Sequence, residues 1–137
     1  MSTRRKAREL ALKMLYQFEM VKVSLEQALE ALEEGERFSP ESADFAMNLV
    51  KGAEEKKEEI SQIIMSASRH WSLERMALID KNILRIAVYE LKYLNMIPFK
   101  VTINEAVELA KRFGDVGSSS FVNGVLDKIS KEVGTEC

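Results

Sequence analysis

The chain has 137 residues, of which 46% are hydrophobic and 31% charged, a balance typical of a globular domain. This length can bury a hydrophobic core without disulfide or metal staples. The single cysteine, Cys137, excludes an internal disulfide and a CxxC zinc or redox site. No apolar run is long enough to cross a membrane, and no signal core follows the basic start, so we expect a cytoplasmic protein.

The overall net charge of −2 conceals a strong asymmetry along the chain. Residues 1–22 carry a net charge of +4, whereas residues 23–60 carry −7. A nucleic-acid contact can be local even where the whole chain is acidic. The basic N-terminal segment is therefore the first candidate for binding.

Apolar residues recur at spacings of three and four in the first half of the chain, which predicts helices. The first predicted helix covers residues 4–21. Ser24 opens a second helix with a capping box, and Gly35 ends it. The pair Ser39-Pro40 is a typical helix start and predicts one long helix that runs to about residue 68.

The second half of the chain gives three more helical segments. Ser72 is expected to cap a short turn, and residues 76–95 are apolar nearly all round, which predicts a central helix. Thr102 is expected to open the next helix with a capping box, and Gly114 to end it. A last helix, which includes residues 121–133, follows a short polar loop.

These elements predict an all-α fold of six or seven helices without a strand pair. Residues 1–68 are expected to form one small helical bundle and residues 76–137 a second, with residues 69–75 as a hinge. Because each bundle is small, we expect the two to pack as one compact unit and a single domain, residues 1–137.

The sequence offers little material for catalysis. His70 is the only histidine, and a lone histidine beside a tryptophan is more often structural than catalytic. The glutamates between residues 54 and 59 alternate with lysines, which is typical of a solvated helix face and not of a metal site. We expect no metal and no cofactor, and catalytic partners that are distant in the sequence stay open.

A cluster of cations at the start of the first helix is the strongest sign of a binding function. Arg4, Arg5, Lys6 and Arg8 lie within five residues, and the arginines are expected on the side opposite the apolar face. Cations in the first turn oppose the helix dipole, so helix stability does not account for them. Phosphate binding does, although a solubilising terminus is the alternative.

The loop before the last helix is the second candidate. Glycines and serines ahead of a helix N-terminus offer backbone N–H groups and hydroxyls to a phosphate, and Phe113 and Phe121 flank them. The alternative is that both rings belong to the core and the serines only cap the helix. Gly124, inside the last helix, suggests a close approach of a neighbouring helix.

Several motifs resemble the NusB family of bacterial transcription antitermination factors. They are RRKARExA at residues 4–11, KxILRIAxYEL at residues 81–91, PxKVxINEAVELAK at residues 98–111 and FVNGVLD at residues 121–127. The resemblance extends over essentially the whole chain and is most specific in its C-terminal half.

This resemblance implies an all-helical fold of two small bundles and no enzymatic activity. It also implies binding to the boxA sequence of nascent RNA together with NusE, a ribosomal protein of the small subunit. The pair would join other Nus factors on RNA polymerase and promote processive transcription of ribosomal RNA operons.

The same resemblance assigns roles to individual residues. RNA contacts would involve Arg4, Arg5, Lys6, Arg8, Phe113, Gly117, Ser118, Ser119, Ser120 and Phe121. NusE contacts would involve Asp80, Lys81 and Arg85. Some family members carry an acidic residue at the position of Gly117 and a basic one near Ser120, so the loop departs from the family pattern.

Two other classes of function are open to a chain with this sequence. A NusB-like domain also occurs ahead of rRNA cytosine methyltransferase domains, but no strand with a glycine-rich cofactor loop is present here. A protein-binding adaptor would use the acidic surface of residues 23–60. The sequence leaves the oligomeric state open, and a homodimer that covers part of the apolar surface and hides the RNA face is one alternative.

Overall fold

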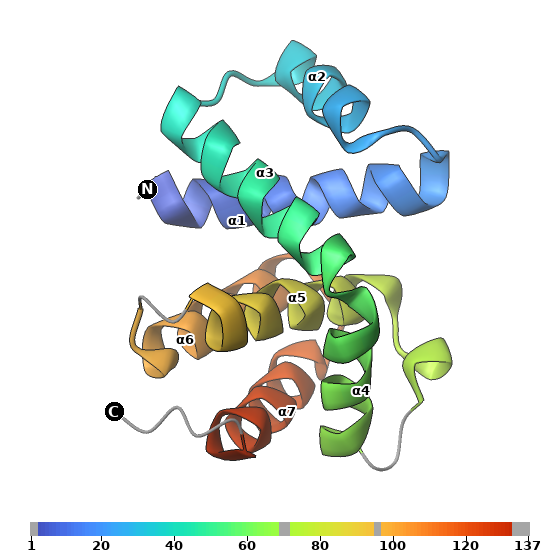
Figure 1. Ribbon diagram of the computed structural model, residues 1–137, viewed down its shortest axis with the longest axis vertical. Helices are drawn as coiled ribbons and strands as arrows, with labels where there is room; N and C mark the ends of the chain where they lie inside the picture. The colour runs from blue at the N-terminus through green and yellow to red at the C-terminus, as the bar shows by residue number, and fades with distance from the viewer. Residues whose placement is uncertain (1–2, 69–71, 95–96, 133–137) are drawn as a thin grey trace. The chain divides into compact units, whose positions relative to one another are not determined.

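The structure, a computed structural model, describes residues 3–68, 72–94 and 97–132 (Figure 1). Within these ranges the chain is helical and contains no strand, which confirms the all-α prediction.

The chain folds into two compact units, one ending at Glu55 and the other beginning at Lys56. The first unit contains α1 (Thr3–Tyr16), the π-helical turn η1 (Gln17–Val21), α2 (Leu25–Gly35) and α3 (Pro40–Glu55). The second contains α4 (Lys57–Ala67), the 3₁₀ turn η2 (Leu73–Arg75), α5 (Leu78–Tyr89), the π-helical turn η3 (Glu90–Leu94), α6 (Phe99–Phe113) and α7 (Ser118–Glu132).

In the first unit, α1 packs mainly against α3. The apolar residues of α1 at helical spacing are fully buried, and α3 contributes a stripe of small and branched residues to the same core. This core includes Ala7, Leu10, Ala11, Met14, Leu15, Ala46, Leu49, Val50 and Ala53. The shorter α2 packs against α1, η1 and α3.

Two helix starts of this unit are as the sequence predicts. The Ser24 hydroxyl accepts a hydrogen bond from the backbone N–H of Gln27, and the Gln27 side chain accepts one from the backbone N–H of Ser24, which completes a capping box. At α3 the Ser39 hydroxyl accepts a hydrogen bond of 3.1 Å from the backbone N–H of Ser42. Local hydrogen bonds of this kind depend only on neighbouring residues, which is why the sequence predicts them.

The long helix predicted from Ser39 to residue 68 is wrong, because the chain forms two helices here. At Lys56 the backbone leaves the helical conformation, with φ −100° and ψ 22°. No apolar residue lies between Ala53 and Ile60, so nothing holds both ends of this stretch to one core. The helix α3 packs on α1, whereas α4 packs on α5 and α7. The two units therefore divide at Lys56 and not at residues 69–75.

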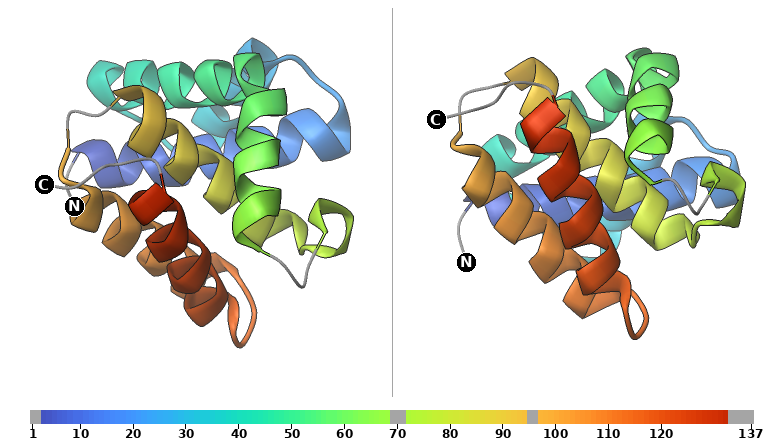
Figure 2. Two further views of the ribbon diagram at one scale, coloured as in Figure 1. Left: turned by 60° about the horizontal axis from the view of Figure 1, so that its bottom comes forward. Right: turned by 90° about the horizontal axis from the view of Figure 1, so that it is seen from below.

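The second unit is built around α5, which contacts α4, α6 and α7. Residues 82–88 are all buried, which confirms the prediction of a central helix. After Tyr89 the helix widens into the π turn η3. The helices α6 and α7 lie side by side in both views of Figure 2 and pack against each other.

Two predicted features of this unit are wrong. Thr102 does not open a helix, because α6 begins three residues earlier, directly after Pro98, and Thr102 is buried inside it. Proline before the first turn starts the helix without any capping side chain. Gly124 faces open space, since a Cβ built there would meet no atom within 4 Å, so no neighbouring helix approaches it.

Candidate nucleic-acid interface

The cations of the first turns of α1 lie beside two aromatic rings of the same unit. Arg4 and Arg5 are exposed. The guanidinium carbon of Arg4 lies 4.8 Å from the centroid of the Phe45 ring, which belongs to α3. A guanidinium over an aromatic face is held in place without losing its charge. The ring of Phe45 therefore orients Arg4 at the surface.

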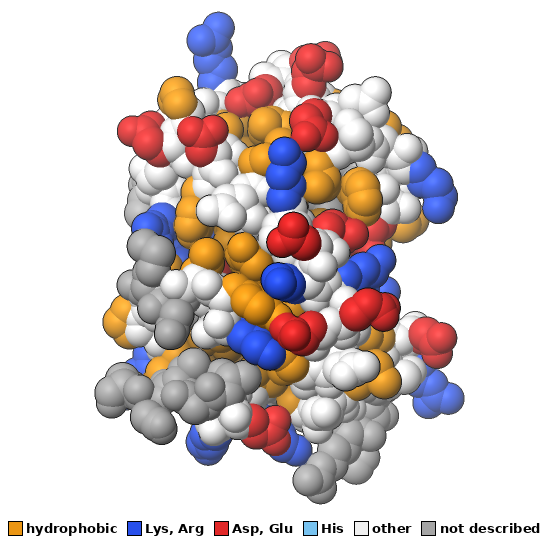
Figure 3. Space-filling model, viewed as in Figure 1, with side chains coloured by type: hydrophobic (Ala, Val, Ile, Leu, Met, Phe, Trp, Pro, Cys, Tyr) orange, Lys and Arg blue, Asp and Glu red, His pale blue; other side chains and the backbone are white. Residues whose placement is uncertain are grey.

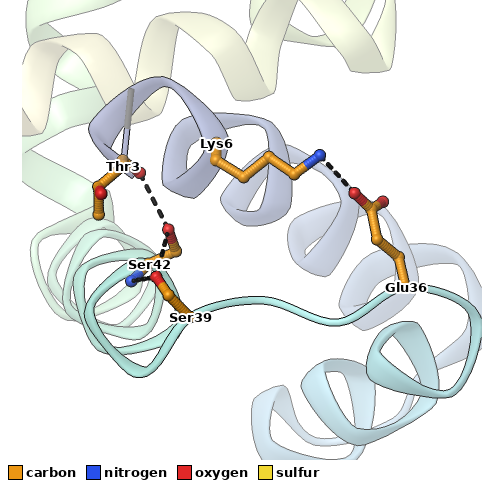
Figure 4. A network of polar contacts seen from close by, with 5 residues as sticks. All are labelled: Thr3, Lys6, Glu36, Ser39 and Ser42. Carbon is orange, nitrogen blue, oxygen red and sulfur yellow. Dashed lines mark hydrogen bonds and ion pairs between the residues drawn. The ribbon is translucent and has the colours of Figure 1, made fainter. Parts of the chain in front are cut away.

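Lys6 has two partners, both from the segment between α2 and α3. Its ammonium forms an ion pair with the carboxylate of Glu36 (Figure 4). The same ammonium lies 5.8 Å from the centroid of the Phe38 ring. The side chains of Lys6 and Glu36 are 33% and 43% exposed, so solvent reaches both members of the pair.

A hydrogen-bond network fixes this segment against the start of α1. The Ser42 hydroxyl donates to the backbone carbonyl of Thr3 over 3.1 Å, and Ser42 is buried. Ser39 bonds both the hydroxyl and the backbone N–H of Ser42 (Figure 4). The beginnings of α1 and α3 are thereby held together, with Lys6 and Glu36 beside them.

Arg8 does not share the exposed face that the sequence predicts for it. It is only 4% exposed, and every residue from Ala7 to Leu12 is buried. The helix is thus covered all round at this level, so a polar residue there is enclosed together with its apolar neighbours. Arg8 and Arg5 both have interaction partners within the chain. The burial of Arg8 is at odds with a direct contact to phosphate.

The loop between α6 and α7 is held by its own backbone and hydroxyl groups. The Ser118 hydroxyl accepts a 3.0 Å hydrogen bond from the backbone N–H of Asp115, and Ser118 is buried. A Cβ at Gly114 would come within 2.5 Å of the Ser118 hydroxyl oxygen. Gly117 has a φ of +93°, which favours glycine. The hydroxyl of Ser118 therefore serves the loop itself.

The other predicted loop residues differ in exposure. Gly117 and Ser120 are exposed, whereas Ser119 and the two phenylalanines are partly buried. The Arg112 guanidinium carbon lies 5.3 Å from the centroid of the Phe113 ring. Phe121 lines a hollow of about 340 Å³ together with Asp80, Asp115, Gly117 and Ser118. Beside this hollow the side chain of Val116 is fully exposed.

The three residues assigned to a protein partner are not equally accessible. Asp80 is buried to nine-tenths and Arg85 is 6% exposed, whereas Lys81 is partly exposed. Arg85 donates a 3.3 Å hydrogen bond from its Nη1 to the Oδ1 of Asn82. Arg85 is therefore enclosed and does not offer the exposed side chain that a NusE contact requires, because α5 packs against α4, α6 and α7.

Charged side chains on one face of the molecule do not gather by sign. On the face drawn in Figure 3, acidic and basic side chains are mixed, and no broad area of one sign covers it.

The sequence analysis does not identify Arg37, Phe38 and Phe45 as site candidates, although Arg37-Phe38 is a cation–aromatic pair directly before a helix start. They lie 33 to 41 residues after Arg4 in the sequence, so only the fold shows that this part of the chain meets α1.

Other functional classes find no counterpart among the residues that the structure describes. No group of three metal-ligating side chains occurs there. None of the helices in this part of the chain has the length and apolar character needed to cross a membrane. His70 and Cys137 lie outside the described residues.

Comparison with known proteins agrees with this architecture. The model of the NusB family matches residues 5–131. The transcription antitermination protein NusB of Myxococcus xanthus (strain DK1622) is 48% identical over 134 residues, which cover 95% of this chain and 96% of that protein.

Solved structures give the same result. The structure of T. maritima NusB superposes with a TM-score of 0.85 at 40% identity, covering 94% of this chain and 91% of that one. A crystal structure of the antitermination factors NusB and NusE in complex with double-stranded RNA has a TM-score of 0.84 at 29% identity, covering 95% and 97%. The chain thus belongs to the NusB family of transcription antitermination proteins, which are factors and not enzymes.

Proposed function

We propose that this protein binds boxA-type single-stranded RNA together with NusE and promotes processive transcription of ribosomal RNA operons. In this role it acts in the cytoplasm, on RNA polymerase and with other Nus factors. The observation that carries the proposal is the set of cations at the start of α1, with Arg4 and Arg5 exposed and with Arg4 and Lys6 next to aromatic rings. The solved complex of a NusB with NusE and double-stranded RNA supports NusE and RNA as partners, whereas the choice of an unpaired strand rests on the chemistry of the surface.

The chemistry of this surface suits an unpaired strand. Cations that neutralise phosphates give affinity that depends strongly on salt and weakly on sequence. Aromatic rings beside them stack on bases that are free of a duplex. A few cations alone bind weakly, so a second protein that enlarges the surface is expected to tighten the complex.

The loop before α7, which belongs to the second unit, is a second proposed RNA-binding region, through Gly117, Ser119, Ser120, Phe113 and Phe121. Ser118 supports this loop from within. Of the three predicted NusE contacts, Lys81 is partly exposed and remains the proposed contact, whereas Asp80 and Arg85 are buried.

The test is a fluorescence anisotropy titration of the full chain with boxA RNA, with a scrambled single strand and with a boxA duplex. We expect weak binding to boxA alone and at least tenfold tighter binding with NusE present, an increase of about 1.4 kcal/mol. An affinity for boxA that NusE leaves unchanged contradicts the cooperative part of the proposal. Failure to bind any of the three RNAs favours a protein-binding adaptor.

A homodimer is a separate matter that the same sample can address. Light scattering with and without boxA RNA measures the mass of the free protein and of the complex. If a dimer covers the RNA surface, RNA binding will convert it into monomers.

A further inference from the structure

The segment between α2 and α3, residues 36–39, lies against the cations of α1 and is not explained by the hydrophobic core. Glu36, Arg37 and Ser39 are exposed, and Phe38 is partly buried. Two contacts join this 36–39 segment to Lys6, the ion pair with Glu36 and the approach of the ammonium to the Phe38 ring. Any polyanion that binds Lys6 therefore meets this segment too.

From these contacts we infer that the 36–39 segment forms a binding site for one unpaired nucleotide, in which Phe38 stacks on the base and Lys6 exchanges Glu36 for the phosphate. The inference rests on the proposed function, since it names where one nucleotide of the bound RNA would lie. It adds Glu36, Arg37 and Phe38 to the residues that determine RNA affinity.

The ring of Phe38 has the surroundings of a stacking platform. A lysine ammonium lies 5.8 Å from its centroid, and the exposed Arg37 directly precedes it in the chain. Rings with cations nearby stack on bases of any type, because every base has a π face and each nucleotide brings a phosphate. With a phosphate on Lys6, the attached base is within reach of this ring.

The Glu36 carboxylate occupies the place that a phosphate would take at Lys6. Because the two side chains are 33% and 43% exposed, solvent screens the pair and it contributes little to stability. Replacing the carboxylate with a phosphodiester preserves the charge-assisted contact of the ammonium. Glu36 thus acts as an internal competitor of RNA, and its removal is expected to strengthen binding.

A purely structural role for Phe38 makes a different prediction. Phe38 precedes the N-cap Ser39, and Ala43 is the fourth residue of α3, so the two occupy the positions of a hydrophobic staple. A leucine would preserve a staple but not a π face. Phe38→Leu therefore separates the two roles, and Phe38→Trp, which restores an aromatic face, is the rescue variant.

The chain offers a matched control for the ion pair. Glu26 and Lys51 form an exposed pair in the same unit, with an Nζ–Oε2 distance of 3.1 Å. Glu26→Gln and Glu36→Gln change the net charge equally, but only Glu36 faces a cation of α1. A general electrostatic effect on RNA binding would therefore be the same in both variants.

The experiment measures the affinity of the full chain and these variants for boxA RNA by anisotropy, with circular dichroism to verify folding. We expect Phe38→Leu to weaken binding about tenfold, Phe38→Trp to restore it, and Glu36→Gln to strengthen it about threefold relative to Glu26→Gln. If Phe38→Leu binds like the wild type, or if the two glutamine variants bind equally, the inference is overturned.

The same data separate this inference from the proposed function. Suppose that the wild type binds boxA RNA, that Arg5→Ala weakens this binding, and that the Phe38 and Glu36 variants have the wild-type affinity. This result overturns the nucleotide site alone. If the wild-type protein does not bind boxA RNA, both the nucleotide site and the proposed function are overturned.

Discussion

The two proposed RNA-binding regions, one in each unit, are constructed in opposite ways. At the start of α1, side chains face outward and are oriented by partners that leave their charge accessible, as Phe45 does for Arg4. In the loop before α7, the hydroxyl of Ser118 accepts a hydrogen bond from the backbone N–H of Asp115, and Gly117 has a left-handed backbone conformation. The first region is thus organised to present charge, and the second to maintain a backbone shape.

The comparison between Arg5 and Arg8 tests the first region most strongly. Arg8 is buried and engaged within the chain, so Arg8→Ala is expected to lower the free energy of unfolding by about 2–3 kcal/mol. Arg5 is exposed, so Arg5→Ala should weaken boxA binding several-fold and leave stability nearly unchanged. Urea unfolding and RNA titration of both variants measure these effects. Equal stabilities of the two variants would show that Arg8 is not structural.

A methyl group at Gly114 tests the shape of the loop. In Gly114→Ala the new Cβ would lie 2.5 Å from the Ser118 hydroxyl oxygen and 2.8 Å from the Ala110 carbonyl oxygen, so the loop has to open. We expect a loss of about 2 kcal/mol in the free energy of unfolding. Gly35→Ala, where a Cβ meets no atom within 4 Å, is the control and should not destabilise the protein. Thermal unfolding of both variants decides the matter.

The helix after the loop gives an effect of opposite sign. Gly124 lies inside α7 with open space where a side chain would extend, so Gly124→Ala should raise the free energy of unfolding by about 1 kcal/mol. RNA binding should not change, because the loop keeps its own hydrogen bonds. A parallel loss of RNA affinity would mean that α7 itself contributes to binding.

The smallest expected effect concerns the control ion pair. Backbone hydrogen bonding, assisted by Lys51, lowers the pKa of the Glu26 carboxyl below its usual value of 4.5. A lowered folded-state pKa stabilises the protein above the unfolded-state pKa, and this contribution disappears as the pH falls through the folded-state value. Glu26→Gln should therefore be slightly less stable than the wild type at pH 7 and equally stable in acid. Unfolding curves across this range should converge as the pH falls.

Sequence patterns predicted the features that depend on neighbouring residues. The capping box of Ser24, the start of α3 after Ser39 and the end of α6 at Gly114 all follow from contacts within one helical turn. The break at Lys56 was not predictable in this way, because it depends on which core each half of the predicted helix joins. The burial of Arg8 and Arg85 has the same origin, since a polar residue on a helix is normally placed on the outside.

The same distinction applies to the candidate site. The cations of α1 stand together in the sequence and were identified from it. Glu36, Phe38 and Phe45 were not, because their proximity to Arg4 and Lys6 arises only when α1 and the start of α3 come together.

The π turns at the ends of α1 and α5 have a consequence for the length of the chain. A π turn accommodates one residue more than a regular turn, so a deletion within Gln17–Val21 or Glu90–Leu94 can be absorbed by tightening to the α-helical register. The residues that follow would then keep their direction around the helix axis, whereas the same deletion in the regular part of α1 or α5 would rotate them by about 100°. The two π turns thus set the direction in which the chain leaves α1 and α5.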